Sequence, residues 1–314
     1  MKPLRVLVTG GGGFIGSHVL KALLRQRIPT ISFDMSPIDN AVSSVLTKEE
    51  LTQVESVAGD ICDFPALCRT IKEHQITHIV HLASMLIDAA ASDPYRASQV
   101  MNGGFVHVLE AARLFGLRKV VWASSMAVFG PDTGDIKGND DPHNPESVYG
   151  ACKSWGEHMS EHYYKQWGVD SVGLRFGVVF GFGRLRGPTR FATDLIRLPA
   201  LNQPFEFKYG SSLIDWQYVG DIAKLTVQSL LAGPLPKRCY NVRGESKTVK
   251  EAAEMVRRFV PDADIRLGDG IMAVVPVGDD TELLNDLGVR CETPLERAIA
   301  ETIASYRSDP KYND

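Results

Sequence analysis

The chain has 314 residues, of which 44% are hydrophobic and 23% charged, a composition typical of globular proteins that argues against disordered and fibrous classes. This length is enough for one large domain with an appended lobe, or for two modest domains. The formal net charge is -4 and no block of lysine and arginine occurs. A nucleic-acid partner is therefore not expected, because phosphate binding normally requires a basic surface.

The cysteines and the N-terminus indicate the compartment. Five cysteines are widely spaced without a C-x-x-C pair: Cys62, Cys68, Cys152, Cys239 and Cys291. Such scattered thiols are typical of a reducing compartment, so we expect a cytoplasmic location. The first apolar run breaks at Gly10 with no small-residue cleavage site after it, which favours a buried strand over a secretory signal. No segment approaches the ~20 apolar residues of a membrane span, so no membrane partner is expected.

Short apolar runs alternate with segments of helical periodicity through the first half of the chain. In chain order the pattern predicts a strand at Leu4–Thr9, a helix at Phe14–Gln26, a strand at Thr30–Phe33, a helix from Asp63 to His74, a strand at Thr77–Leu82, a helix at Pro94–Phe115, a strand at Leu117–Ala123, a helix at Glu146–Trp167 and a strand at Ser171–Arg175. Asp63 and Asp93 are expected to be N-caps, with Pro94 at the first helical position. Strands separated by helices of this length predict β-α-β units and a parallel sheet.

The second half is less regular. The segment Gly177–Pro188 is rich in glycine and arginine and is predicted to be a loop. Two T-x-x-E patterns, at Thr248 and at Thr293, predict capping boxes at the starts of short helices, the second with Pro294 as its first helical residue. These helices are expected to form a smaller lobe.

Residues 9–16 read TGGGGFIG, directly after the first predicted strand and at the start of the first helix. The run fits G-x-G-x-x-G through Gly11, Gly13 and Gly16, and G-x-x-G-x-x-G when Gly10 replaces Gly11; spacing does not separate the two. Glycines here allow a tight turn and close approach of the backbone to a pyrophosphate, which the helix N-terminus attracts. The alternative is a glycine-rich turn without a ligand.

Asp34 ends the second predicted strand, near the ~20-residue spacing at which a carboxylate binds the ribose hydroxyls of a dinucleotide. It would repel a 2′-phosphate, and no lysine or arginine follows before Lys48, which favours NAD over NADP. The alternative is a turn or helix cap. Together with the glycine loop, Asp34 predicts an α/β fold with a Rossmann-type, doubly wound parallel sheet that binds NAD, followed by a smaller α/β substrate lobe.

Tyr149 and Lys153 stand four residues apart on a predicted helix and therefore share one face. An adjacent ammonium favours the phenolate, so the pKa of Tyr149 is expected to fall from about 10 toward the working range. Such a phenol can exchange a proton with a substrate hydroxyl, and Ser124-Ser125 after a predicted strand would hold the same oxygen. Alone, Y-x-x-x-K is more often a surface pair.

This combination resembles the extended short-chain dehydrogenase/reductase family, of the NAD-dependent epimerase/dehydratase type, along most of the chain. Further landmarks are Gly59-Asp60-Ile61, His81-Leu82-Ala83-Ser84, Asn102, the serine-containing run 124–130, Leu174-Arg175, and residues 215–219 with Asp221. The resemblance implies that Tyr149 is the acid/base, that Lys153 binds the nicotinamide ribose and lowers the tyrosine pKa, and that Ser125 contacts the substrate.

The resemblance also implies where NAD and a second subunit would bind. The cofactor would contact Gly10, Gly13, Phe14, Ile15, Gly16, Asp34, Asp60, Ile61, Leu82, Ala83, Ser84, Asn102, Ser124, Tyr149 and Lys153. Residues 1–175, with 215–242 returning to them, would form the NAD-binding domain, and 176–214 with 243–314 the substrate lobe. A homodimer would form through the helices at 94–115 and 146–167, although their apolar residues could equally belong to the core of one subunit.

Departures from the family pattern bear on the substrate, which we expect to be a small molecule. Met126 and Ala127 stand where dehydratases carry an acidic pair, so 4,6-dehydration is not expected. Ile214 precedes Asp215 where many nucleotide-sugar enzymes carry an arginine that binds the diphosphate. A UDP- or dTDP-sugar is thereby in doubt.

The loop after the sixth predicted strand contains Arg184, Arg186 and Arg190. They could bind a phosphate or the carboxylate of a sugar acid, or form a solvated basic loop. The apolar residues 85–87 would line the pocket or simply pack. The predicted substrate contacts are Met85, Ser125, Met126, Arg184 and Arg186.

The motif H-x-x-E-H at residues 158–162 has the inverted zinc-peptidase spacing. It continues the Tyr149 helix, so we interpret it as helix surface and expect no metal. Three functions remain: hydride transfer with a sugar, sugar acid or similar substrate; epimerisation of a nucleotide sugar with tightly bound NAD; and NAD binding in a regulatory or scaffold protein. The intact Ser125, Tyr149 and Lys153 argue against the third.

Overall fold

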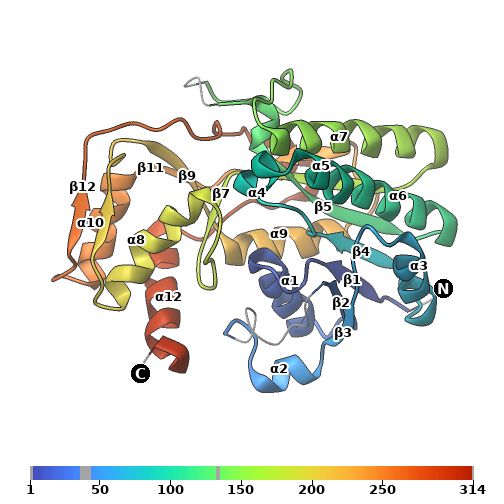
Figure 1. Ribbon diagram of the computed structural model, residues 1–314, viewed down its shortest axis with the longest axis horizontal. Coiled ribbons are helices and arrows are strands. Elements are labelled where there is room, and N and C mark those ends of the chain that lie inside the picture. Colours follow the sequence, from blue (N-terminus) through green and yellow to red (C-terminus); the bar gives the residue numbers. More distant parts are fainter. Residues whose placement is uncertain (1–2, 36–43, 132–134, 313–314) are drawn as a thin grey trace.

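A seven-stranded sheet in the order β10-β6-β5-β4-β1-β2-β3, parallel at every pairing, forms the centre of the computed structural model, which describes residues 3–35, 44–131 and 135–312 (Figure 1). Its strands are β1 (Val6–Thr9), β2 (Thr30–Asp34), β3 (Glu55–Ala58), β4 (His78–His81), β5 (Lys119–Ser125), β6 (Ser171–Phe176) and β10 (Cys239–Asn241). The predicted doubly wound parallel sheet is confirmed.

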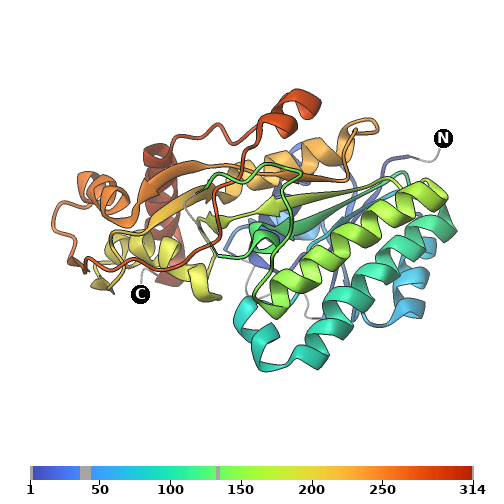
Figure 2. The same ribbon diagram turned by 90° about the horizontal axis from the view of Figure 1, so that it is seen from above.

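Alternating side chains of the central strands divide the core into two layers. Val6 and Val8 point to the face covered by α1 (Phe14–Arg25) and α9 (Val219–Leu231). Leu7 points to the face covered by α3 (Phe64–Glu73), α6 (Gly104–Phe115) and α7 (Val148–Trp167). Helices α6 and α7 lie side by side on this second face (Figure 2).

Helices α4 (Ile87–Ser92) and α5 (Pro94–Ala97) follow β4, and a π-helical turn, Ser98–Gly103, joins α5 to α6. The predicted helix from Pro94 to Phe115 therefore contains a π segment. Asp63 and Asp93 cap α3 and α5 as expected. Helix α2 (Lys48–Thr52) and β3 were not predicted from the sequence.

The smaller lobe contains two short sheets and lies beside the carboxyl ends of the central strands (Figure 1). One sheet pairs β7 (Val178–Phe180), β9 (Leu213–Tyr218) and β11 (Glu245–Thr248), and the other pairs β8 (Phe205–Phe207) with β12 (Ile265–Leu267). Helices α8 (Phe191–Ala200), α10 (Val249–Phe259) and α12 (Leu295–Ser308) pack around them, and α11 (Thr281–Leu287) contacts β10.

Two predictions for this half are wrong. The segment predicted to be a loop after β6 contains β7, because Val178 and Phe180 fill the core of the lobe. The capping box at Thr248 is present, but the one at Thr293 is not. The Thr293 hydroxyl donates instead to Asp221 at 2.8 Å, so α12 begins after Pro294 without a side-chain cap.

In the described part of the chain, no helix has both the length and the apolar character needed to cross a membrane.

Candidate functional site

The glycine loop between β1 and α1 is closely packed. Gly10 has a φ of +72°, and a Cβ there would lie 2.7 Å from the Ala83 nitrogen. A Cβ on Gly16 would lie 2.1 Å from the Gly10 carbonyl oxygen, so helix and loop can meet this closely only without side chains. Gly13 is the N-cap of α1 and offers no side-chain acceptor, so the N–H groups of the first turn remain available to an anion.

A cleft of about 380 Å³ opens beside this loop. It gathers nine of the predicted contacts: Gly10, Gly13, Asp34, Asp60, Ile61, Leu82, Ala83, Ser84 and Met85. It is also lined by Gly59, a landmark of the resemblance, and by residues that sequence reasoning missed: Phe33, Met35, Arg96 and Val100. Arg96 reaches the cleft from α5 and pairs with Asp60 at 2.8 Å. Nothing in its local sequence distinguishes Arg96 from a surface residue.

Two carboxylates fix the walls of the cleft. Asp34 Oδ2 accepts a hydrogen bond from the Gly12 N–H at 3.1 Å and so ties the end of β2 to the glycine loop. Burial alone would raise the pKa of Asp60, but hydrogen bonds from the Cys62 N–H and from Arg96 lower it below its usual value. The lowered pKa keeps Asp60 ionised at the wall of the cleft.

Asn102 lies in the π-helical turn, and its buried Oδ1 has no hydrogen-bond partner among the described residues. A buried amide oxygen without a partner is costly, and π-helical turns are frequent at functional sites. The glycine cradle and the Asp34 carboxylate are groups of the kind that hold a dinucleotide. The residues present therefore fit NAD.

Ser125, Tyr149 and Lys153 come together at the carboxyl end of β5. Tyr149 is half-buried, and the Ser125 side chain acts on its phenol, while Ser125 Oγ donates to the Phe176 carbonyl at 3.4 Å. Lys153 Nζ donates to the Ala123 carbonyl at 2.7 Å and lies 5.5 Å from the centre of the Tyr149 ring. The three proposed catalytic side chains thus lie near one another.

The predicted lowering of the Tyr149 pKa is wrong for the protein alone. Burial raises the pKa of Tyr149, and the hydrogen bond from Ser125 and the charge of Arg184 only partly oppose it. Lys153 contributes little because its ammonium bonds a backbone carbonyl and faces the ring rather than the hydroxyl.

The Lys153 ammonium is buried, and burial lowers its pKa to about 8. Burying this charge therefore lowers the free energy of unfolding. The loss is complete below pH 8, where Lys153 is charged in both states, and it disappears above pH 10.5, where the unfolded chain also loses the proton. We expect Lys153→Met to stabilise the protein at pH 7. The relieved cost of about 3 kcal/mol, less ~1 kcal/mol for the lost hydrogen bond, leaves a gain of about 2 kcal/mol.

Urea unfolding of both proteins from pH 7 to 10.5 measures this gain, which should shrink as the pH rises. A variant that is equally destabilised across the whole range would show that the ammonium is not penalised by burial.

The predicted substrate contacts differ in their burial and in their distance from the site. Arg184 enters the site from the loop after β7: its guanidinium lies 5.8 Å from the Phe14 ring, and its charge acts on Tyr149. It donates to the Val179 carbonyl and, at 2.5 Å, to the Thr189 hydroxyl. Burial lowers the Arg184 pKa to about 10, so the group remains a cation at neutral pH.

The other loop arginines are more peripheral. Arg186 is exposed and forms no ion pair with a described residue, and Arg190 pairs with Asp194 at 2.7 Å. Met126 is fully buried and packs near Gly278, so the structure does not bring it to an open surface. Met85 lines the cleft.

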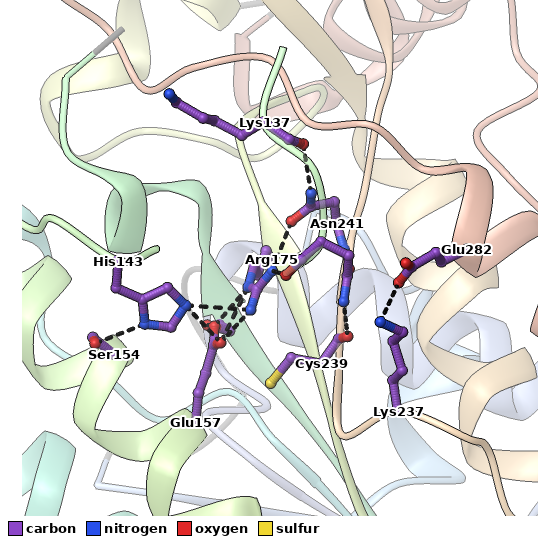
Figure 3. Close-up of polar contacts among 11 residues, drawn as sticks. Lys137, His143, Ser154, Glu157, Arg175, Lys237, Cys239, Asn241 and Glu282 are labelled. Carbon is purple, nitrogen blue, oxygen red and sulfur yellow. Dashed lines mark hydrogen bonds and ion pairs between the residues drawn. The ribbon is translucent and has the colours of Figure 1, made fainter. Parts of the chain in front are cut away.

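Ser124, predicted to contact the cofactor, is 1% exposed and donates to Glu157 at 2.5 Å. Figure 3 shows Glu157 in a buried network with Arg175 and His143. No sequence signal identified this network, because its members come from distant segments.

The H-x-x-E-H residues lie along α7, where Glu161 pairs with Lys165 at 3.0 Å and His162 contacts Trp167. Within the described ranges, no group of three or more His, Cys, Asp or Glu side chains is arranged to hold a metal ion.

Comparisons with known proteins agree with this geometry. Residues 6–242 match the model of the NAD dependent epimerase/dehydratase family. The chain is 31% identical to UDP-glucose 4-epimerase of Azospirillum brasilense, over 84% of this chain and 82% of that protein. It is also 31% identical to UDP-glucuronate 4-epimerase 4 of Arabidopsis thaliana, over 97% of this chain and 76% of that protein.

Solved structures are equally similar. UDP-glucose 4-epimerase of Thermus thermophilus, in complex with NAD, superposes with a TM-score of 0.83 at 25% identity over 97% of this chain and 99% of that one. The GalE-like L-threonine dehydrogenase of Cupriavidus necator gives 0.85 at 25% identity over 96% and 99%. The chain belongs to the NAD-dependent epimerase/dehydratase family and is an NAD-dependent enzyme of the short-chain dehydrogenase/reductase type.

Proposed function

We propose that the protein is a dehydrogenase that oxidises a hydroxyl-bearing carbon of a small polar acid, such as a sugar acid, with Ser125, Tyr149 and Lys153 as its catalytic residues. The observation that carries this proposal is the position of Arg184, a half-buried cation whose charge acts on the phenol and whose guanidinium lies 5.8 Å from the ring of Phe14, beside the glycine loop. A carboxylate on this cation would place a neighbouring hydroxyl close to Tyr149.

NAD, when bound, supplies the two-electron acceptor. Ser125 would hold the substrate oxygen by a hydrogen bond, and Tyr149 would take the hydroxyl proton as the carbonyl forms. The phenol must lose its own proton first, and the charge of Arg184 would favour the phenolate. In the reverse direction Tyr149 would return the proton to the carbonyl oxygen.

Arg184 is suited to a carboxylate because its geometry is fixed and donors remain. A guanidinium has five N–H groups, and the bonds to the Val179 carbonyl and the Thr189 hydroxyl use two of them. Planar, bidentate recognition of a carboxylate by such a group adds both energy and orientation.

Ile214 supports a substrate without a diphosphate. Its side chain is fully buried in the core of the lobe, where it cannot bind a phosphate. Epimerisation of a UDP-sugar remains the second candidate, because two relatives at 31% identity are named as such epimerases.

A panel of sugar acids, polyols and UDP-sugars, followed at the absorbance of reduced cofactor, separates these functions. A dehydrogenase accumulates NADH with a hydroxy acid. An epimerase converts the UDP-sugar without net reduction, and a scaffold protein turns over nothing in the panel.

We further propose that the predicted cofactor residues bind NAD within a domain of residues 1–175 and 215–242, and that 176–214 and 243–314 form the substrate lobe. A homodimer through α6 and α7 is supported by exposed apolar side chains on these helices, with Leu114 at 54% and Trp167 at 50% exposure. The five cysteines are free thiols, which supports a cytoplasmic location.

We expect Arg184→Met to raise the KM for a hydroxy acid about 10- to 100-fold, because a charge-assisted hydrogen-bond pair is lost. The KM for an uncharged polyol should change little. Arg186→Met, in the same loop but exposed, is the matched control and should leave both constants near those of the unaltered protein. Equal KM values for the two variants would contradict carboxylate binding by Arg184.

A further inference from the structure

Two consecutive residues at the end of β5 bond to two residues of α7 that are spaced by four, an arrangement we call the β5–α7 ladder. Its rungs are Ala123 O with Lys153 Nζ at 2.7 Å and Ser124 Oγ with Glu157 Oε1 at 2.5 Å. Tyr149 lies one helical turn before Lys153, and Ser125, the next residue of β5, lowers the pKa of its phenol. The first rung holds the proposed catalytic Lys153, whereas the proposed catalysis gives no role to the rung between Ser124 and Glu157.

Glu157 is held from the opposite side by Arg175 of β6. Arg175 Nε donates to Oε1 at 2.9 Å and Nη2 donates to Oε2 at 2.5 Å, while His143 Nε2 lies 3.3 Å from Oε2 (Figure 3). The side chains of Arg175 and Glu157 are 5% and 6% exposed, so both ions are removed from water. Such a pair persists only when its remaining hydrogen bonds are satisfied.

Arg175 also extends the network to segments that precede and flank α7. Its Nη1 donates to the Asn139 carbonyl at 2.7 Å and to Asn241 Oδ1 at 3.0 Å. His143 in turn bonds the Ser154 hydroxyl of α7 at 2.8 Å (Figure 3). The carboxylate of Glu157 is therefore fixed to β5, to β6 and to the approach of α7 at once.

We propose that Glu157, paired with Arg175, is a positioning residue that sets the register of α7 against β5, so that Tyr149 and Ser125 reach the same substrate oxygen while the carboxylate balances the charge of Lys153. This inference rests on the proposed function of Ser125, Tyr149 and Lys153. Glu157 can set this register because its rung of the ladder lies one helical turn beyond Lys153 on the same face of α7.

Several groups face the Lys153 ammonium. They are His81 from β4, Tyr149, Cys152 and Glu157 from α7, and the Trp122 ring of β5. Burial lowers the pKa of Lys153, and Cys152 and Glu157 oppose this. Glu157 itself is faced by Arg175, His143, Ser124 and Cys239. Removing the Glu157 charge takes a negative charge away from Lys153 and leaves the Arg175 cation without its partner. Both effects would lower the pKa of Lys153.

The test uses Glu157→Gln, which keeps an acceptor for Ser124 but removes the charge. The pKa of Lys153 can be measured by NMR on the full protein with carbon-13-labelled lysine, with Lys153→Met to assign the signal. We expect this pKa to fall by about one unit. The alkaline limb of the pH–rate profile should shift to lower pH together with this pKa, and turnover should fall at least tenfold.

Ser124→Ala removes the rung and keeps both charges, so it separates position from charge. We expect turnover to fall several-fold while the pKa of Lys153 stays unchanged. Ser160→Ala is the matched control: it also removes a buried serine hydrogen bond of α7, to Ser171 of β6, but lies outside the ladder and should leave turnover unchanged. If Glu157→Gln fails to fold, Glu157→Gln with Arg175→Gln removes both charges and takes its place.

The inference is overturned if the Lys153 pKa is unmoved without the Glu157 charge and Ser124→Ala behaves as Ser160→Ala does. Failure of the proposed function gives a different result, because Tyr149→Phe would then remain active. An inactive Tyr149→Phe with unaffected Ser124 and Glu157 variants would refute the positioning role alone.

Discussion

Tyr149→Phe is expected to lower kcat by about 100-fold or more, the usual contribution of a positioned acid/base. The change removes only the hydroxyl and leaves the ring beside Lys153. NADH formation with the best hydroxy acid of the panel measures kcat, and NAD titration of the variant measures cofactor affinity. We expect that affinity to stay within about twofold, because the glycine loop and Asp34 are untouched.

A natural control for this substitution is Tyr164→Phe. Tyr164 lies on the same helix, is 39% exposed and stacks with the guanidinium of Arg238. Its hydroxyl has no role in the proposed chemistry, so the variant should match the unaltered protein. If Tyr149→Phe also retains full turnover, the acid/base assignment is wrong.

Gly16→Ala should have the second largest effect, on cofactor binding. A Cβ at this position would lie 2.1 Å from the Gly10 carbonyl oxygen and 2.8 Å from the Gly11 Cα, both backbone atoms that cannot rotate away. Helix α1 must then move from the loop, and its first-turn N–H groups leave the position suited to a pyrophosphate. We expect NAD affinity, measured by calorimetry, to fall at least 100-fold.

Gly233→Ala provides the matched substitution, since a Cβ there meets no heavy atom within 4 Å. It should bind NAD normally. Thermal unfolding of both variants distinguishes a lost binding site from a lost fold. Normal NAD affinity in a folded Gly16→Ala protein would contradict the phosphate site at the glycine loop.

The sequence was sufficient for the elements whose signals are local. Asp63 and Asp93 cap helices as predicted, because an aspartate at an N-cap acts on its own next residues. Thr293 shows the limit of such reasoning. Its capping pattern is as good as that of Thr248, but Asp221, distant in sequence, takes its hydroxyl. Strand β3 was missed because it is a largely exposed edge strand without an apolar run.

In the candidate site, too, only the features with local sequence signals could be predicted. The glycine loop, Asp34 and the Y-x-x-x-K pair carry spacing signals, and the structure gathers them at one edge of the sheet. The protonation of Tyr149 could not be derived from spacing, because it depends on burial and on the hydrogen bond that Lys153 donates to the Ala123 carbonyl. Arg96 and the Glu157–Arg175 pair join segments whose proximity is set only by the tertiary fold.

A crystal structure of the protein with NAD bound would show whether Tyr149 stands at the nicotinamide. We expect the pyrophosphate to lie over the first turn of α1 and the Tyr149 hydroxyl to face the nicotinamide ring, with room for one small acid between the ring and Arg184. A phenol turned into the core, or a nicotinamide bound away from the carboxyl end of β5, would contradict it.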